Sequence, residues 1–155
     1  MSAQTVATNP LRILLVEDST MQAVLTQQAA NASSRVEIID VAQDGQEAIE
    51  FLRCKDNYEN AERPDLILLD LNMPKKDGLQ VLEEMKRDKE LQTIPVILFT
   101  TSECAEDIFK SYAYGANTFI TKPTRIDELR EVLDDIGRYW SHAKLPGTEQ
   151  SERAA

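Results

Sequence analysis

Side chains able to bind metal and phosphate stand at the ends of four apolar segments of this chain. Glu17 and Asp18 follow the first segment, and Asp70 follows the third. Thr100 ends the fourth, and Lys122 follows the fifth. Carboxylates are ligands that Mg²⁺ prefers, a carboxylate can attack phosphorus to form an acyl phosphate, and a lysine can bind phosphoryl oxygens. These residue types favour phosphoryl transfer to an aspartate at a metal site.

The apolar segments have the pattern of buried strands, because most are continuous rather than alternating, as expected for a strand covered on both faces. They span 13–16, 36–39, 66–69, 96–99 and 118–120. Between them, apolar residues recur at helical spacing. The clearest stripes are Met21, Val24, Leu25, Gln28 and Ala29 in the first helix and Ile126, Leu129, Val132, Leu133 and Ile136 in the last. Strands alternating with helices predict a doubly wound α/β domain with a parallel sheet covered on both faces.

The predicted sheet explains how residues far apart in the chain would meet. In an open parallel sheet, ligands bind beyond the carboxyl ends of the strands, at the topological switch point. We therefore expect Glu17, Asp18 and Asp70 to lie together, with Thr100 and Lys122 nearby. Three carboxylates in one place repel one another unless a cation lies among them. We expect Lys122 to pair with Asp70 before phosphorylation and with phosphoryl oxygens afterwards.

Each of these residues also has an ordinary structural explanation. Glu17 and Asp18 can be solubilising acids, or Asp18 can cap the following helix. Asp70 can serve a turn, Thr100 can be a helix cap and Lys122 can be a surface charge. Their occurrence at four separate strand ends favours the functional interpretation of the whole set.

The same segments resemble the response-regulator receiver domain over about 11–137. The matching segments are 13–18 (ILLVED), 70–74 (DLNMP), 77–78 (DG), 95–100 (PVILFT) and 121–123 (TKP). The resemblance implies a flavodoxin-like, five-stranded sheet in the order 2-1-3-4-5 with helices on both faces. It also implies a bound Mg²⁺, a histidine kinase as phosphoryl donor, and a signalling phosphoacceptor rather than an enzyme.

The resemblance further implies roles for individual residues. Asp70 matches the phosphoryl acceptor, and Lys122 matches the lysine that contacts the phosphoryl group. Thr100 matches the hydroxyl that moves to the phosphoryl group, and Phe119 matches the aromatic side chain that turns inward on activation. The implied metal ligands are Glu17, Asp18, Asp70 and the backbone carbonyl of Asn72.

A narrower resemblance is to the small response regulators that partner cyanobacterial phytochromes. It rests on the long polar loop 54–63, the run 98–102 and the segment 139–146. It implies a phytochrome-type photoreceptor kinase as partner. Tyr139, Trp140 and Leu145 follow the last expected helix, where they either fold back on their own domain or form a homodimer or kinase contact.

The domain organisation follows from these patterns. We expect residues 1–10 to be a flexible N-terminus, 11–138 to be the receiver domain and 139–155 to be a C-terminal extension and tail. The residues after Lys144 are too few for a DNA-binding domain, so we expect the signal to pass by protein contact.

Composition excludes several classes of partner. The formal net charge of -10 argues against binding to nucleic acid or to anionic membrane. The first residues lack the pattern of a signal peptide, and no apolar segment approaches the roughly 20 residues of a membrane-spanning helix. Cys54 and Cys104 stand alone, which suits a reducing compartment, and we expect the protein to be cytoplasmic.

Three other interpretations fit parts of the pattern. Phosphatases with an aspartyl phosphate intermediate typically place a second aspartate two residues after the nucleophile, where this chain has Asn72. A flavin or nucleotide module needs a glycine-rich first turn, whereas 17–20 reads EDST. A receiver that binds partners without phosphorylation is disfavoured by the complete set of acids, hydroxyl and lysine.

Overall fold

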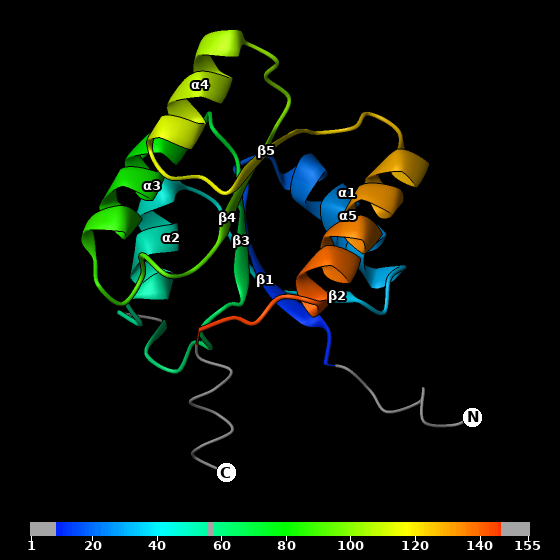
Figure 1. Ribbon diagram of the computed structural model, residues 1–155, viewed down its shortest axis with the longest axis horizontal. Helices are drawn as coiled ribbons and strands as arrows, with labels where there is room; N and C mark the ends of the chain where they lie inside the picture. Colours follow the sequence, from blue (N-terminus) through cyan, green and yellow to red (C-terminus); the bar gives the residue numbers. More distant parts are fainter. Residues whose placement is uncertain (1–8, 56–57, 147–155) are drawn as a thin grey trace.

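The computed structural model describes residues 9–55 and 58–146, which form an α/β domain (Figure 1). Five parallel strands make one sheet in the order β2-β1-β3-β4-β5, as predicted. The strands are β1 (Leu11–Val16), β2 (Val36–Ala42), β3 (Leu66–Leu69), β4 (Val96–Thr100) and β5 (Thr118–Thr121). The helices are α1 (Thr20–Asn31), α2 (Gly45–Leu52), α3 (Gly78–Arg87), α4 (Ala105–Ala113) and α5 (Ile126–Ser141). The expected flexible N-terminus and the end of the expected tail lie largely outside the described residues.

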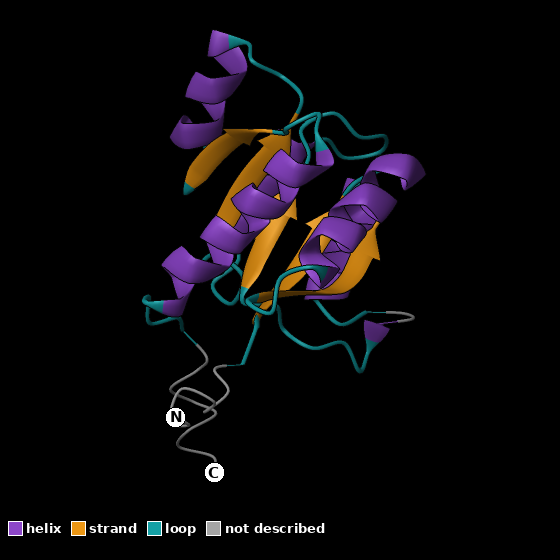
Figure 2. Cartoon of the chain, turned by 90° about the vertical axis from the view of Figure 1, so that its right-hand side faces the viewer, coloured by secondary structure: helices purple, strands orange, loops and turns teal. Residues whose placement is uncertain are grey.

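The helices cover both faces of the sheet, with α1 and α5 on one face and α2, α3 and α4 on the other (Figures 1 and 2). Each strand sends alternate side chains into two separate cores. In β3, Leu66 and Leu68 belong to the core beneath α1 and α5, whereas Ile67 and Leu69 belong to the core beneath α2 and α3. All four side chains are fully buried, which explains the continuously apolar segment.

Helix α1 packs through a face that shares only Ala29 with its predicted apolar stripe. Its buried residues are mostly small: Ala23, Thr26, Ala29 and Ala30. Met21, Val24 and Leu25 are exposed instead. The small side chains let α1 lie close to the sheet and to α5, which supplies the larger apolar residues of this core. Part of the stripe therefore faces outward, and its Val24 lines a groove together with Glu17 and Asp18.

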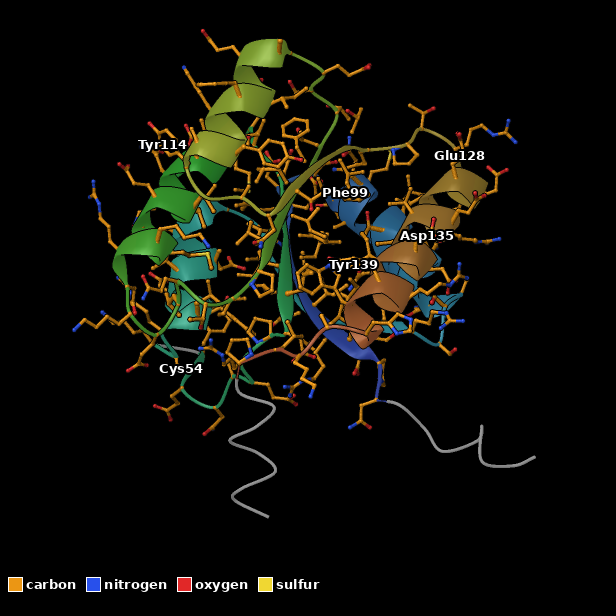
Figure 3. All side chains as sticks on the ribbon, in the orientation of Figure 1. Cys54, Phe99, Tyr114, Glu128, Asp135 and Tyr139 are labelled. Carbon is orange, nitrogen blue, oxygen red and sulfur yellow. The ribbon has the colours of Figure 1, made fainter. Side chains whose placement is uncertain are left out.

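Helix α5 is longer than predicted. It continues through Ser141, so Tyr139 and Trp140 lie within it and the expected domain boundary at 138/139 falls inside the helix. Trp140 and Leu145 pack against the core beneath α1 and α5, so this part of the extension folds back on its own domain. Tyr139 points outward and is 67% exposed (Figure 3). Among the described residues, no helix is both long and apolar enough to cross a bilayer.

The loop between α2 and β3 is attached to the domain at several points. Arg12 of β1 forms ion pairs with Glu62 at 2.7 Å and with Asp65 at 3.5 Å. The Tyr58 ring packs edge-on against Phe51 of α2, with ring centroids 5.4 Å apart. Burial, together with the nearby negative charge of Glu47, raises the pKa of Tyr58 to about 12.

This raised pKa makes the stability of the protein sensitive to alkaline pH. An unfolded tyrosine loses its proton near pH 10, whereas folded Tyr58 keeps its proton until about pH 12. The folded state therefore loses stability as the pH rises from about 10 to about 12. We expect urea unfolding of Tyr58→Phe, which keeps the ring contact with Phe51, to show a smaller loss over this window than the wild type. Equal losses of unfolding free energy in the two proteins would show that Tyr58 is not the source of this pH dependence.

Candidate functional site

The acidic residues at the ends of β1 and β3 lie side by side. Val16 and Leu69 are register partners in the sheet, and the Asp70 backbone N–H donates to the Val16 carbonyl at 3.0 Å. Glu17, Asp18 and Asp70 each offer a carboxylate oxygen, and these oxygens all lie within 4.8 Å of one another. The convergence expected from the strand order is therefore present.

The three carboxylates differ in their surroundings. Glu17 is only 2% exposed, Asp70 is half-buried and Asp18 is exposed. Oε2 of Glu17 accepts the backbone N–H of Ser19 at 3.1 Å, and Oδ1 of Asp70 accepts that of Leu71 at 2.9 Å. Ser19, not Asp18, caps α1, so Asp18 remains available for a ligand. Glu17 and Asp18 also line a groove between α1 and β2.

This donor set fits a hard divalent cation. It contains only carboxylate oxygens, with no thiol or imidazole, which suits Mg²⁺ or Mn²⁺ rather than softer metals. The clustering of three acids on adjacent strand ends is costly without a counter-charge. Asn72, the predicted fourth ligand through its carbonyl, lies in the exposed turn two residues after Asp70.

Gly78 lets this turn and the start of α3 lie close to the end of β3. Gly78 begins α3, and its backbone N–H donates to the Leu71 carbonyl at 2.8 Å. A Cβ added at Gly78 would lie 2.4 Å from the Asp70 carbonyl oxygen, so any larger residue would push the helix away from Asp70. The Asp-Gly pair in the sequence thus has a steric reason.

Lys122 reaches the site from the far edge of the sheet, and its partners differ from the predicted one. Its side chain is 6% exposed and forms an ion pair with Glu17, not with Asp70. Its Nζ also donates to Oε1 of Gln22 at 2.6 Å. The Phe99 ring lies beneath it, with its centroid 5.7 Å from Nζ. Glu17 is the most buried of the three acids, so it gives the ammonium the strongest Coulomb attraction.

Gln22 is a member of this cluster that the sequence reasoning missed. It lies in the first turn of α1, and its backbone N–H donates to the Ser19 side chain at 3.3 Å. The position of Gln22 could have indicated the site. A side chain in the first turn of the helix that follows Glu17 and Asp18 lies at the same end of the sheet as these acids.

Thr100 and Phe119 occupy neighbouring strands. Thr100 ends β4, is 1% exposed and accepts the backbone N–H of Ser102 at 3.5 Å. Phe119 lies in β5, half-buried against the core beneath α2 and α3. Its backbone N–H donates to the Tyr112 hydroxyl of α4 at 3.1 Å.

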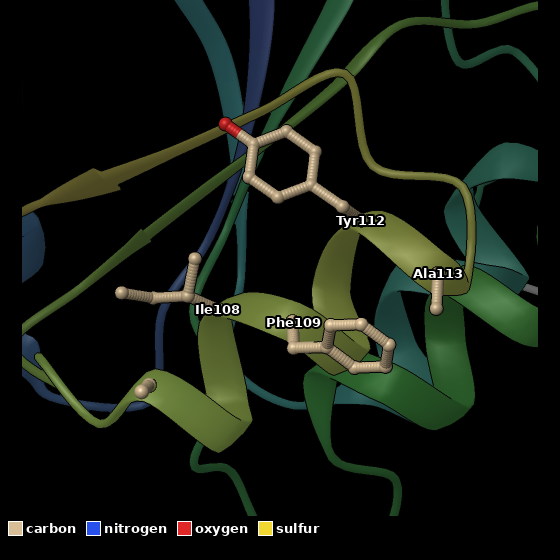
Figure 4. Close-up of a pocket in the computed structure, with 5 residues that line it drawn as sticks. Ile108, Phe109, Tyr112 and Ala113 are labelled. Atoms are coloured by element: carbon tan, nitrogen blue, oxygen red, sulfur yellow. The ribbon is translucent and has the colours of Figure 1, made fainter.

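A separate hollow lies on α4 and shares no residue with the acidic site (Figure 4). Its lining is almost entirely apolar and consists of Ala105, Ile108, Phe109, Tyr112 and Ala113. It has no groups suited to a metal or a phosphate.

Comparisons with known proteins agree with this geometry. The family model for the "Response regulator receiver domain" matches residues 13–134. The response regulator Rcp1 of Synechocystis sp. is 40% identical over 131 residues, which cover 84% of this chain and 89% of Rcp1. The probable methanogenesis regulatory protein FilR2 of Methanothrix harundinacea is 35% identical over 136 residues, covering 86% of each chain.

Solved structures of response regulators have the same fold as this chain. The phosphorylated cyanobacterial phytochrome response regulator RcpA superimposes with a TM-score of 0.81 at 43% identity, covering 89% of this chain and 99% of RcpA. The Mn²⁺-bound form of Rcp1 superimposes with a TM-score of 0.78 at 41% identity, covering 89% of this chain and all of Rcp1.

Proposed function

Because this chain belongs to the receiver domain family of two-component response regulators, we propose that it is a switch that accepts a phosphoryl group on Asp70 from a histidine kinase. The observation that carries this proposal is the arrangement around Asp70. Its carboxylate lies with those of Glu17 and Asp18 at the carboxyl edge of the sheet, and the ammonium of Lys122 is buried against Glu17.

The chain's own residues have separate tasks in the transfer. A carboxylate oxygen of Asp70 attacks phosphorus in line as the bond from phosphorus to the donor breaks, and the donor leaves with the electron pair. The ammonium of Lys122 donates a hydrogen bond to an equatorial phosphoryl oxygen. Glu17, Asp18, Asp70 and the Asn72 carbonyl would hold a divalent cation, which neutralises phosphoryl charge when bound. Hydrolysis of the acyl phosphate resets the switch.

The switch itself is proposed to involve Thr100 and Phe119. The Thr100 hydroxyl moves to the phosphoryl oxygens, which opens space beside β4 and lets Phe119 turn inward. Phe119 is already half-buried and its backbone is bonded to Tyr112 of α4. A change in its side chain therefore alters the surface where β5 meets α4, which is available to a protein partner.

We propose Mg²⁺ as the resident cation, supported by the all-carboxylate donor set and by the Mn²⁺-bound form of the relative Rcp1. Saturating Mg²⁺, at about 100 times its Kd, is expected to raise the free energy of unfolding by about 2.7 kcal/mol. Asp18→Asn removes one ligand and one repelling charge, so it is expected to be more stable than the wild type in a chelator and to gain little from Mg²⁺. Urea unfolding with and without Mg²⁺ measures both effects. A wild-type protein whose free energy of unfolding does not change with Mg²⁺ would contradict the proposal.

The proposed partner is a phytochrome-type sensor kinase. This is supported by the similarity to RcpA, a cyanobacterial phytochrome response regulator, and to the bacteriophytochrome response regulator AtBRR, at 36% identity and a TM-score of 0.69. The protein is proposed to act in the cytoplasm as a phosphoacceptor rather than as an enzyme, without binding nucleic acid or membrane.

Acetyl phosphate, a small phosphoryl donor, tests the function directly. We expect incubation with acetyl phosphate and Mg²⁺ to add one phosphoryl group by intact mass, and a chelator to prevent the addition. Peptide mapping should locate the group between Leu66 and Lys75. No adduct with acetyl phosphate and no binding of a beryllofluoride mimic would reject the proposal.

A homodimer through the last helix is a further proposal, now centred on one residue. Of the three interface candidates, Tyr139 is the one that is largely exposed, whereas Trp140 and Leu145 pack on their own domain. We expect Tyr139→Lys to shift a concentration series measured by light scattering toward the monomer. Tyr114→Lys, which alters an exposed tyrosine outside α5, is the matched control. Unchanged masses for Tyr139→Lys at every concentration would exclude this interface.

A further inference from the structure

The side chain of Gln22 accepts a hydrogen bond from Lys122. Gln22 was not among the site residues predicted from the sequence. We infer that Gln22 is a positioning residue that fixes the ammonium of Lys122 for phosphoryl transfer to Asp70. The observation is the 2.6 Å hydrogen bond from Lys122 Nζ to Gln22 Oε1, made by a side chain that is 6% exposed. This inference rests on the proposed function of Asp70.

The number of hydrogen-bond donors on Lys122 explains how the bond to Gln22 can orient the ammonium. A lysine ammonium has three N–H donors and no acceptor, so it must face the carbonyl oxygen of Gln22 and not the amide nitrogen. Among the described residues, Glu17 and Gln22 accept two of these donors. Two fixed bonds set the orientation of the ammonium and leave one N–H for a phosphoryl oxygen.

Gln22 and Glu17 do not hold Lys122 in the same way. Glu17 also belongs to the acidic cluster suited to a divalent cation, so a bound cation would compete with the ammonium for the same carboxylate. Gln22 is neutral and lies outside that cluster, on α1, where Ser19 caps the helix. Its bond to Lys122 is therefore the one that would persist if a bound cation drew the Glu17 carboxylate away from the ammonium.

The consequence for the reaction is kinetic. With acetyl phosphate, an Asp70 oxygen forms the new O–P bond while the bond between phosphorus and the acetyl oxygen breaks, and acetate leaves with the electron pair. Lys122 forms no bond to phosphorus; its ammonium donates a hydrogen bond to the phosphoryl oxygens during the transfer. An ammonium without the Gln22 acceptor samples more orientations, so loss of this acceptor slows the step without removing any reacting atom.

The test compares two methionine substitutions on α1. Gln22→Met keeps the length of the side chain and removes the acceptor, and we expect it to slow phosphorylation by acetyl phosphate at saturating Mg²⁺ by about tenfold, as for the loss of a hydrogen bond to a charged group. Gln28→Met, an exposed position of the same helix, should match the wild type. Gln22→Glu restores an acceptor of the same length and should remain within about threefold of the wild type.

A second measurement needs neither metal nor phosphate. If Gln22 acts through Lys122, Gln22→Met should lower the urea midpoint in the wild type but not in a Lys122→Met background. An unchanged phosphorylation rate in Gln22→Met, or an equal midpoint shift in both backgrounds, would overturn the inference. A wild type that gains no phosphoryl group would instead reject the proposed function, and the unfolding cycle would then decide alone whether Gln22 positions Lys122.

Discussion

Asp70→Asn is expected to lose all Mg²⁺-dependent phosphorylation by acetyl phosphate. The asparagine amide is not a nucleophile toward phosphorus, although it keeps the size of the aspartate side chain and the N–H acceptor used by Leu71. The fold should persist, because the buried core around β3 is unchanged. Intact mass over a time course measures the loss. We expect no phosphorylated Asp70→Asn to be detected at any time at which the wild type is phosphorylated.

The control is Asp135→Asn on the outer surface of α5, where the carboxylate is 65% exposed and pairs with Arg138. It makes the same chemical change away from the sheet edge and should be phosphorylated at the wild-type rate. If Asp70→Asn still gained a phosphoryl group on the peptide that contains residue 70, Asp70 would not be the acceptor.

Lys122→Met should have two large effects that can be measured separately. Removing a preorganised charge from the transferring group is expected to slow phosphorylation by about 10²–10³-fold. Removing the ammonium also leaves the Glu17 carboxylate, which is 2% exposed, without its counter-charge and next to two other acids. Breaking a buried pair in this way costs about 3–5 kcal/mol of unfolding free energy. Urea unfolding in a chelator measures the second effect.

A double substitution separates the two effects. Lys122→Met combined with Glu17→Gln removes the unpaired charge, so it should recover much of the stability but not the rate. Lys110→Met, at a half-exposed surface ion pair with Glu106, should change neither. A normal phosphorylation rate in Lys122→Met would remove Lys122 from the mechanism.

The strands and the acidic cluster could be predicted because their causes are local. A strand buried on both faces must be apolar at every position, as Leu66 to Leu69 are. Strand order then places Glu17 and Asp70 together, since they follow register partners. Helix α1 could not be predicted in the same way. Its predicted apolar stripe included Ala29 but neither Ala23 nor Ala30, and all three alanines are buried against the core.

The partner of Lys122 and the length of α5 were also beyond the sequence pattern. Several acids at this edge of the sheet could pair with Lys122. Which of them does so depends on how deeply each is buried, and burial is known only from the packed structure. The residue type of Gln22 gave no signal, because a lone glutamine on a helix is usually a surface residue, and only its place in the first turn of α1 pointed to the site. The last turn of α5 is polar at Arg138 and Ser141, so its apolar signal fades before the helix ends.

The ion pair between Glu17 and Lys122 joins residues 105 positions apart, at opposite ends of the domain sequence. During synthesis on the ribosome, the acceptor Asp70 is therefore made long before the lysine that completes its site. A nascent chain that ends before β5 carries the aspartate but lacks the ammonium, and we expect small phosphoryl donors to react with it far more slowly than with the complete domain. On the proposed function, we expect the switch to respond at its full rate only when the last strand has joined the sheet, so an unfinished chain would rarely send a false signal.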